Sequence, residues 1–413
     1  MKNHVKYLVL LFLALFPYTA GKSQSLFQLV ESVPAETLLE QSSLPRTADV
    51  WAEMIRSAKK SIDIEVFYIA DEKGEPLEKI INEIIDAGER GVEVRIIIDE
   101  NFYKRYPESD KPFRNKTNIT LRIISFSSAA GGVMHAKYFI VDSEELFLGS
   151  QNFDYRALKH IHEIGVRVRN KNLAAMFSAI FNADWSLCES KDYSKENINL
   201  LFAKSSGKIY NYKNKLVLKA KNYGKIKLYP AFSPPGFINT GFANEEAELI
   251  RFIRSSKKSL YINYFSYSTK GKSKDAPYTT IDDEIRRAAG RGVDVKIIFS
   301  DWAIKKDAID QIKALSEVKG VSVKLSTIPQ YSGGFIPYSR VQHCKIMIRD
   351  GKYSWISTAN FERSYFYESR NATLIIENKK VYQDISEVFL RVWESGYAEL
   401  IDINKEYKSV KRE

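Results

Sequence analysis

Two stretches of the sequence recur at an interval of about 200 residues, and this duplication constrains the fold more than any other feature. Residues Ile55–Ile62, IRSAKKSI, return as Ile253–Leu260, IRSSKKSL. Residues 87–97, AGERGVEVRII, return one residue shorter as 289–298, AGRGVDVKII. Because both matches keep the same order and nearly the same spacing, the chain is predicted to contain two copies of one structural unit.

Expected helices and strands follow the same order in each copy. A helix and an apolar strand come first, followed by a second helix, a glycine turn at Gly88 or Gly290, and another strand. The first helix and the two strands are expected at 49–60, 62–68 and 92–98 in the first copy and at 245–258, 260–267 and 293–299 in the second. Strands that alternate with helices predict an α/β fold with two largely parallel or mixed sheets, each flanked by helices.

The duplication also sets the expected domain boundaries. We expect an N-terminal half at residues 26–200 and a C-terminal half at residues 236–413. Residues 201–235 include a segment rich in Lys, Tyr and Asn, which predicts a basic linker or hairpin that is solvated, with contact to the substrate as the alternative.

Residues 1–25 have the pattern of a signal peptide. A positively charged start at Met1–Lys6 precedes the apolar run Tyr7–Phe16, and small residues such as Thr19 and Ala20 follow. The run is short for a membrane span, and an uncleaved anchor is the alternative. The pattern predicts a protein that is secreted, periplasmic or luminal.

The third match between the copies is a short motif of reactive residues. His135-Ala136-Lys137 begins an H-x-K-x4-D pattern that ends at Asp142, and His343-Cys344-Lys345 begins one that ends at Asp350. Side chains two apart in a strand share a face, so each motif presents an imidazole and an ammonium together. Each aspartate is an odd number of residues from its histidine and is expected to point away, in a structural role.

A hydroxyl residue and an asparagine follow each motif, Ser150 and Asn152 in the first copy and Thr358 and Asn360 in the second. The spacing from histidine to asparagine is 17 residues in both copies (152 − 135 and 360 − 343). A returning strand would bring these side chains to the mouth of the site. The glycine pairs 131–132 and 333–334 precede the motifs and are expected to leave room for a substrate.

With these residues the chain resembles the phospholipase D superfamily, whose members carry paired HKD motifs. The likeness is greatest to the endolysosomal, exonuclease-like branch, in Leu148–Leu158, Glu163–Val166 and Thr280–Asp283. The chain departs from that branch at its N-terminus and at Phe361, where the branch usually has Trp. The resemblance implies a duplicated phospholipase D-type fold with the active site at the interface of the two halves.

The resemblance also implies roles for these residues. His135 would be the nucleophile that forms a phosphohistidine, and His343 the general acid and base, although the symmetry of the motifs leaves the two interchangeable. The donors expected to hold the phosphoryl oxygens are Lys137, Lys345, Asn152 and Asn360. Ser150 and Thr358 are expected to contact substrate.

Two carboxylates resemble the family's supporting groups, which fix the histidine tautomers. They are Glu163 and Glu368, and Glu362 and Glu377 are alternatives to Glu368. His160 and His162 are expected to pack rather than react. Aromatic residues in the strands are expected to be core residues or to stack on bases at a cleft; they are Tyr68, Tyr264, Tyr267 and Tyr365.

No metal or other cofactor is predicted, because two imidazoles supply the chemistry and no C-x-x-C or H-E-x-x-H pattern occurs. The net charge of +11 favours a polyanionic partner. The favoured function is a metal-independent, 5′-exonuclease-like nuclease on single-stranded nucleic acid. A phospholipase D or transphosphatidylase on anionic phospholipids and an inactive binding protein are the alternatives. One chain supplies both motifs, so a monomer suffices and no obligate protein partner is expected.

Overall fold

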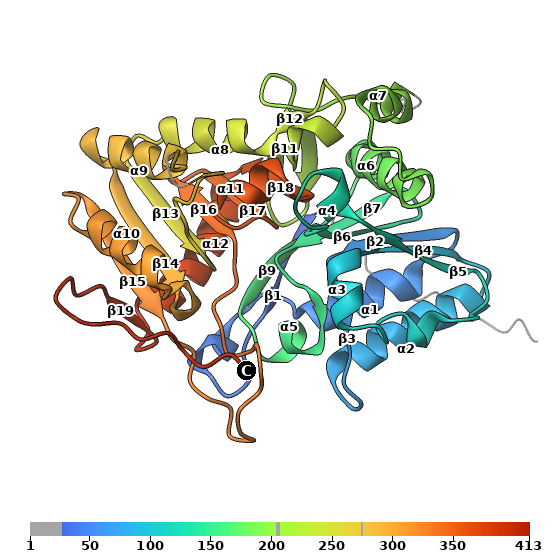
Figure 1. Ribbon diagram of the computed structural model, residues 1–413, viewed down its shortest axis with the longest axis horizontal. Helices are drawn as coiled ribbons and strands as arrows, with labels where there is room; N and C mark the ends of the chain where they lie inside the picture. Colours follow the sequence, from blue (N-terminus) through green and yellow to red (C-terminus); the bar gives the residue numbers. More distant parts are fainter. Residues whose placement is uncertain (1–26, 204–206, 274–275) are drawn as a thin grey trace, which may run out of the picture.

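A computed structural model describes residues 27–203, 207–273 and 276–413, which form two sheets that lie side by side, one from each half of the chain (Figure 1). The expected signal peptide at 1–25 lies outside the described residues. Within these described ranges, no helix is both long and apolar enough to cross a membrane.

The first sheet has seven strands, of which three are parallel to one another. In order across the sheet the strands are β1 (Phe27–Ser32), β9 (Glu163–Arg169), β7 (Glu145–Gly149), β6 (Lys137–Val141), β2 (Ser61–Val66), β4 (Glu93–Asp99) and β5 (Ile119–Ile124). The parallel strands are β2, β4 and β5, and every other neighbouring pair is antiparallel. A separate short pair joins β3 (Ile69–Ala70) to β8 (Phe153–Asp154).

The second sheet repeats this plan with ten strands. In order they are β10 (Leu216–Ala220), β11 (Gly224–Ser233), β18 (Asn371–Glu377), β17 (Tyr353–Ser357), β16 (Ile346–Arg349), β13 (Ser259–Tyr264), β14 (Asp294–Ser300), β15 (Val321–Ser326) and β19 (Ala398–Leu400), with β12 (Ala243–Asn244) beside β11. Again three strands, β13, β14 and β15, are parallel. Both sheets are therefore mixed, because the strands after each histidine return through tight turns, which join only antiparallel neighbours.

Helices flank both sheets, as the alternating pattern predicts (Figure 1). In the first half they are α1 (Thr47–Ser57), α2 (Pro76–Glu89), α3 (Glu100–Arg105), α4 (Phe126–Ala129), α5 (Tyr155–Lys159), α6 (Lys171–Ser190) and α7 (Lys195–Ala203). In the second half they are α8 (Glu245–Arg254), α9 (Thr280–Gly290), α10 (Lys306–Ser316), α11 (Arg363–Tyr367) and α12 (Lys379–Trp393).

The glycine turns lie slightly later than expected. Gly88 and Gly290 belong to α2 and α9, and the residues with left-handed φ are Gly91, at 92°, and Gly292, at 85°. Gly88 serves packing instead, because a Cβ there would lie 2.4 Å from the carbonyl oxygen of Thr117.

Residues 216–233, within the segment between the halves, form a hairpin, which is one of the two forms expected, but this hairpin is packed rather than solvated. Strands β10 and β11 form a hairpin that joins the second sheet, and β11 pairs along its length with β18. Ala231 and Phe232 of β11 are fully buried. This hairpin covers the strand that begins at Asn371, a residue of the site described below.

One hydrophobic core extends across both halves. Phe177 of α6 packs edge-on against Tyr138 of β6 and against Phe232 of β11, each at a centroid distance of 5.0 Å. A second core lies under α1 and α2, where Trp51 stacks on Phe153. Because α6 contacts both sheets, the halves are fixed relative to each other by buried apolar surface.

Candidate active site

The two histidines lie where the halves meet, each immediately before a central strand, β6 or β16. The backbone N–H of His135 donates to the carbonyl of Arg370 in the other half, and that of His343 donates to the carbonyl of His162, both at 3.0 Å. The main chain of each half therefore binds the backbone of the histidine that belongs to the other half. The expected interface site is present.

The side chains cross the interface in the same way. Glu163, the first residue of β9, is fully buried, and its two oxygens lie 2.8 and 2.9 Å from Nδ1 of His343. Asn371, the first residue of β18, is also fully buried, and its Oδ1 lies 2.9 Å from Nδ1 of His135. One histidine therefore has a carboxylate as its partner, whereas the other has a neutral amide.

Glu368 does not occupy the position expected for it. Its carboxylate pairs with Arg363 at the surface end of α11, and neither histidine is its partner. The residue equivalent to Glu163 is Asn371, since both follow the histidine of their own copy by 28 residues (163 − 135 and 371 − 343). The repeat interval was the signal that could have identified Asn371. Glu368 was predicted instead because the second histidine was also expected to have a carboxylate partner.

Both lysines of the motifs are buried beside the histidines. Lys137 donates to the carbonyl oxygen of His135 at 2.7 Å, and Lys345 donates to that of His343 at 2.8 Å. Burial lowers the pKa of Lys137 well below its usual value, and the charge of Lys345 adds to this effect. Burial lowers the pKa of Lys345 to about 7, although Glu163 opposes the shift. Two ammonium groups that are shielded from solvent would attract an anion strongly.

The pKa of each histidine is lowered as well. Burial is the largest cause, and the positive charges of Lys137 and Lys345 add to it for both rings. Burial also raises the pKa of Glu163 to about 8. A phosphate diester between the rings would partly reverse the pKa shifts of the histidines and lysines, because its negative charge favours the protonated imidazole and the charged lysines.

Asn152 and Asn360, the asparagines that follow the two motifs, are both buried. Among the described residues, neither Oδ1 atom has a hydrogen-bond partner, although both are inaccessible to solvent. A buried polar atom without a partner is costly, which is typical of a group that binds a ligand. Which end of each amide faces the ligand is an assignment from hydrogen bonding.

Ser150 and Thr358 do not lie where a substrate would contact them. Both are fully buried and bond to the next strand of their own half. Thr358 donates to Oδ1 of Asn371 at 2.9 Å and accepts from the N–H of Ala372. Ser150 accepts from the N–H of Ile164 at 3.1 Å. These hydroxyl groups position Asn371 and the start of β9, so their role is structural.

The glycine pairs also have a different role from the one expected. A Cβ on Gly132 would lie 2.4 Å from the carbonyl oxygen of Glu368 and from the hydroxyl of Ser369. The backbone that approaches Gly132 is thus that of the other half, not a substrate. Gly334, with φ of 106°, belongs to an exposed turn next to Tyr331.

Asp142 and Asp350 hold the turns that precede β2 and β13. The carboxylate of Asp142 accepts from the backbone N–H groups of residues 59, 60 and 61, and that of Asp350 accepts from residues 257, 258 and 259. Neither points toward a histidine. This arrangement explains why the motif ends in aspartate in both copies.

Aromatic rings that the motif search missed border the histidines. Phe67 packs edge-on against His135 at a centroid distance of 5.0 Å, and Phe265 packs against His343 at 4.7 Å. They are equivalent positions of the repeat, 198 residues apart (265 − 67), the same interval that separates Ile55 from Ile253. Tyr365 contacts the other side of His135 at 4.7 Å, whereas Tyr264 and Tyr267 lie in the core.

Behind the site lie two buried ion pairs, and the second of them joins the two halves. His162 lies between Gln342 and Glu31 of β1, with its Nε2 atom 2.6 Å from the carboxylate of Glu31. Burial opposes charge on His162, but Cys344 and Glu31 outweigh it and raise its pKa to about 10. At the equivalent position, Arg370 makes two bonds of 2.7 Å to Asp184 of α6. Both residues support the backbone that carries Glu163 and Asn371.

The duplicated α/β fold with two histidine–lysine pairs at one interface defines a class, the phosphodiester-cleaving enzymes of the phospholipase D type. The family described as cardiolipin synthase, PLD-like domain, matches residues 52–185 and 249–393. The chain belongs to this family, within the phospholipase D superfamily.

Curated relatives cover nearly the whole chain. "Phospholipase D Z" of Dictyostelium discoideum is 28% identical over 387 residues, with 90% of both chains covered. The "virion nicking-joining enzyme" of vaccinia virus is 30% identical over 394 residues and covers 91% of this chain and 89% of its own. A 5′-3′ exonuclease of Xenopus tropicalis is 27% identical over 422 residues, with 93% and 83% covered.

Among solved structures, phosphatidylserine synthase of Haemophilus influenzae superposes with a TM-score of 0.60 at 14% identity, over 86% of this chain and 85% of its own. This similarity concerns the fold. Together with the relatives, it confirms the α/β fold and the phosphodiesterase class that the paired motifs predict.

Proposed function

We propose that this phosphodiesterase works through a phosphohistidine on His135 and acts as an exonuclease on single-stranded nucleic acid. The observation that supports the mechanism is that the two histidines have different hydrogen-bond partners: His135 contacts the amide of Asn371, and His343 contacts the carboxyl group of Glu163. The nucleic-acid substrate is supported by the net charge of +11 and by the names of the vaccinia and Xenopus relatives.

The amide of Asn371 is suited to a nucleophilic imidazole. Its nitrogen donates to the carbonyl of Tyr365 at 2.8 Å and its oxygen accepts from Thr358, so the oxygen faces His135. An amide oxygen accepts the Nδ1 proton without charging the ring, and this leaves a lone pair on Nε2. The resemblance to the family assigned His135 as nucleophile, and this contact gives the assignment a physical reason.

Glu163 is suited to the opposite task. Because burial raises the pKa of Glu163 to about 8, the Glu163–His343 pair holds one proton between the carboxyl group and Nδ1 and a second on Nε2, which His343 can give to the leaving oxygen. In the first step, Nε2 of His135 forms a bond to phosphorus while the bond to the leaving oxygen breaks, and that oxygen takes the proton of His343. In the second step, His343 takes a proton from water, the water oxygen bonds to phosphorus, and the P–N bond breaks.

Lys137, Lys345 and the two asparagines are the donors for the non-bridging oxygens in both steps. Removal of one such preorganised donor costs roughly 10²–10³ in rate. Lipid cleavage is the second candidate, because a Dictyostelium relative is named a phospholipase D and the chemistry at phosphorus is the same.

The test uses the purified chain with EDTA present. One arm contains a labelled single-stranded oligonucleotide with a free 5′-hydroxyl, and the other contains phosphatidylglycerol vesicles. Stepwise shortening of the oligonucleotide, abolished by His135→Asn, is expected. Headgroup release with an intact oligonucleotide would show that the substrate is a phospholipid. Loss of both activities in EDTA would contradict the two-histidine mechanism. We also propose that residues 1–25 direct secretion; N-terminal sequencing of the exported protein tests this.

A further inference from the structure

A row of aromatic rings leads from His135 away from the histidine pair. Phe67, which touches His135, lies 3.9 Å from Phe102 of α3 between ring centroids. Tyr68 stacks on Phe102 at 5.3 Å and 16°, and Tyr106 stacks on Tyr68 at 6.0 Å and 27°. All four rings are partly exposed, so they form one continuous surface that begins at the proposed nucleophile.

The row ends in a cavity of about 530 Å³, within the range of small-molecule sites. Tyr106 forms part of its wall. The wall is mainly apolar and is completed by aromatic, proline and aliphatic side chains, with charged groups at its edge; it includes Ile69, Pro107, Pro112, Tyr155, Arg105 and Lys111. This cavity is separate from the histidine pair, and no step of the proposed mechanism uses it.

The wall of the cavity is held in place from behind. The hydroxyl of Tyr68 donates to Asp154 at 2.8 Å, and Arg156 binds the same carboxylate through Nε and Nη2. Asp154 is buried, and the guanidinium of Arg156 lies 5.3 Å from the ring of Tyr155. The rings therefore keep their orientation without a ligand, which reduces the entropy lost on binding.

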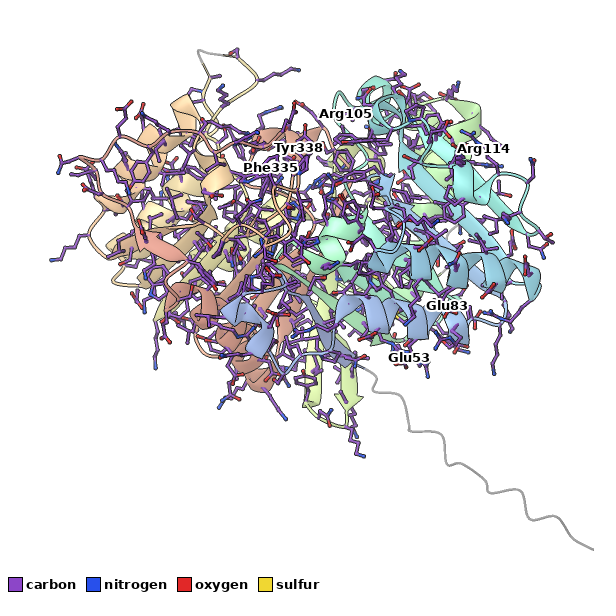
Figure 2. All side chains as sticks on the ribbon, turned by 90° about the horizontal axis from the view of Figure 1, so that it is seen from below. Glu53, Glu83, Arg105, Arg114, Phe335 and Tyr338 are labelled. Carbon is purple, nitrogen blue, oxygen red and sulfur yellow. The ribbon has the colours of Figure 1, made fainter. Side chains whose placement is uncertain are left out.

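Cationic side chains stand at the edge. Arg105 and Lys111 have exposed side chains, at 52% and 72%. Arg105 also donates to the hydroxyl of Tyr338 at 2.6 Å, and Figure 2 shows these two residues, from different halves, side by side. The edge of the cavity thus lies at the boundary between the halves, where the histidines also lie.

We propose that this cavity binds a nucleobase of the substrate strand beyond the nucleotide that is cleaved, with the base against Tyr106 and the adjacent phosphate near Arg105 and Lys111. The proposal rests on the proposed nuclease function and adds a second binding site for the strand. Bases stack on aromatic rings with little regard to sequence, and arginine and lysine pair with the phosphates between them. The order of the row, ring after ring from His135, matches a single strand that extends away from the reacting phosphate.

An acyl chain is the other occupant that an apolar cavity admits. It would gain nothing from parallel rings or from cations at the edge, and the same wall also includes the polar groups of Asp71 and Glu108. A base has polar edges as well as an apolar face. The mixed wall therefore favours the base.

The test compares two substrates for Tyr106→Ala, Tyr106→Trp and the control Tyr212→Ala. Tyr212 is an exposed tyrosine of the segment between the halves, outside both the cavity and the histidine pair. The substrates are a single-stranded oligonucleotide and bis(p-nitrophenyl) phosphate, which has no second nucleoside. Stacking contributes about 1–3 kcal/mol per base, so the ratio of kcat/KM between oligonucleotide and small diester is expected to fall roughly 5- to 150-fold in Tyr106→Ala. Tyr106→Trp should keep the ratio, as should Tyr212→Ala.

An abasic nucleotide moved along the strand locates the contact. In the wild type, an abasic nucleotide at one particular position beyond the cleaved nucleotide should lower kcat/KM by the same factor. In Tyr106→Ala, an abasic nucleotide at that position should leave kcat/KM unchanged. Equal ratios for wild type and Tyr106→Ala, or a uniform abasic effect at every position, would overturn the proposal.

A binding experiment separates this proposal from the proposed function. Oligonucleotide affinity is measured for His135→Asn and for His135→Asn with Tyr106→Ala. If the wild type does not shorten the oligonucleotide but the single variant binds it and the double variant does not, the cavity assignment stands and the exonuclease function fails. If the two variants bind equally or not at all, the cavity assignment fails, whatever the wild type cleaves.

Discussion

Glu163 reaches across the interface between the halves, and its carboxylate lies 2.8 Å from Nδ1 of His343. The corresponding contact of His135 is to the amide of Asn371. Two copies of one motif have thus acquired different electrostatic surroundings through a single pair of residues. The first two predictions test that difference.

Glu163→Gln should slow the chemical step. Glutamine can still accept the Nδ1 proton but carries no charge to stabilise the imidazolium of His343. We expect kcat to fall roughly 10²–10⁴-fold, the range of general acid–base groups, with little change in KM. Single-turnover kinetics measure this. Glu368→Gln makes the same chemical change at a residue that pairs with Arg363 and with neither histidine, and it should keep the wild-type kcat. Equal losses in both variants would contradict the assignment.

Asn371→Asp should make the two histidines more alike in their pKa, because each would then have a carboxylate beside Nδ1. A carboxylate on Nδ1 raises the pKa of His135, and a nucleophile must be neutral. Activity is present above that pKa and is lost as the pH falls through it, so the acidic limb of the kcat/KM profile should move to higher pH. The profile of the wild type, in which burial lowers the pKa of His135, is the reference. An unchanged acidic limb in a folded variant would argue against His135 as the nucleophile.

The two histidines should respond differently to the leaving group. A p-nitrophenolate leaves without a proton, so His343→Ala should lose much less activity on a p-nitrophenyl ester than on an alkyl ester. The same variant should accumulate an acid-labile phosphoryl group on His135, because the second step still needs a base. Labelling with radioactive phosphate measures this. His135→Ala should show equal losses on both esters and no label; label on His343 in that variant would reverse the roles.

Anion binding should weaken above neutral pH. Burial lowers the pKa of Lys345 to about 7, so its ammonium is present below pH 7 and is lost as the pH rises. Dimethyl phosphate, whose charge is constant in this range, should bind to His135→Asn up to about tenfold more weakly for each pH unit above the pKa. Titration calorimetry from pH 5 to pH 9 measures the affinity. In Lys345→Gln the affinity should be weaker and nearly independent of pH, and a flat profile in the parent would contradict the pKa assignment.

Arg370→Met should destabilise the protein. Its guanidinium and the carboxylate of Asp184 are both fully buried, and removal of one partner leaves the other uncompensated. A loss of about 3–5 kcal/mol in the free energy of unfolding is expected by urea denaturation. Arg114→Met breaks the exposed pair with Asp110 and should cost at most about 1 kcal/mol (Figure 2). Equal losses would show that Arg370 is not part of a tightly packed interface.

Much of this arrangement could be predicted from the sequence, because a strand repeats every two residues and a duplication repeats at a fixed interval. These two periods predict that each histidine lies beside its lysine, and in the structure Lys137 contacts His135 and Lys345 contacts His343. Contacts between the halves were harder to predict from the sequence. Asn371 was missed because an amide was not expected where the first copy has a carboxylate, and Ser150 was taken for a substrate ligand because its burial depends on a neighbouring strand.

The packing of the hairpin at residues 216–233 was not predicted, for a related reason. Its lysines gave it the composition of a solvated connector, although the leucines at 216 and 218 and the alanine at 220 alternate with exposed residues and are buried against the sheet. Alternation in a short charged segment indicates a strand more reliably than its overall charge does.

The exchange of main-chain bonds between His135 and Arg370 and between His343 and His162 has a consequence for ancestry. A symmetric dimer of a single half would make both bonds, but it would have to place the same residue behind each histidine. Fusion of the two copies into one chain removed that restriction. The difference between Glu163 and Asn371 requires two copies that can diverge, which a single fused chain provides, and it gives each histidine its own task.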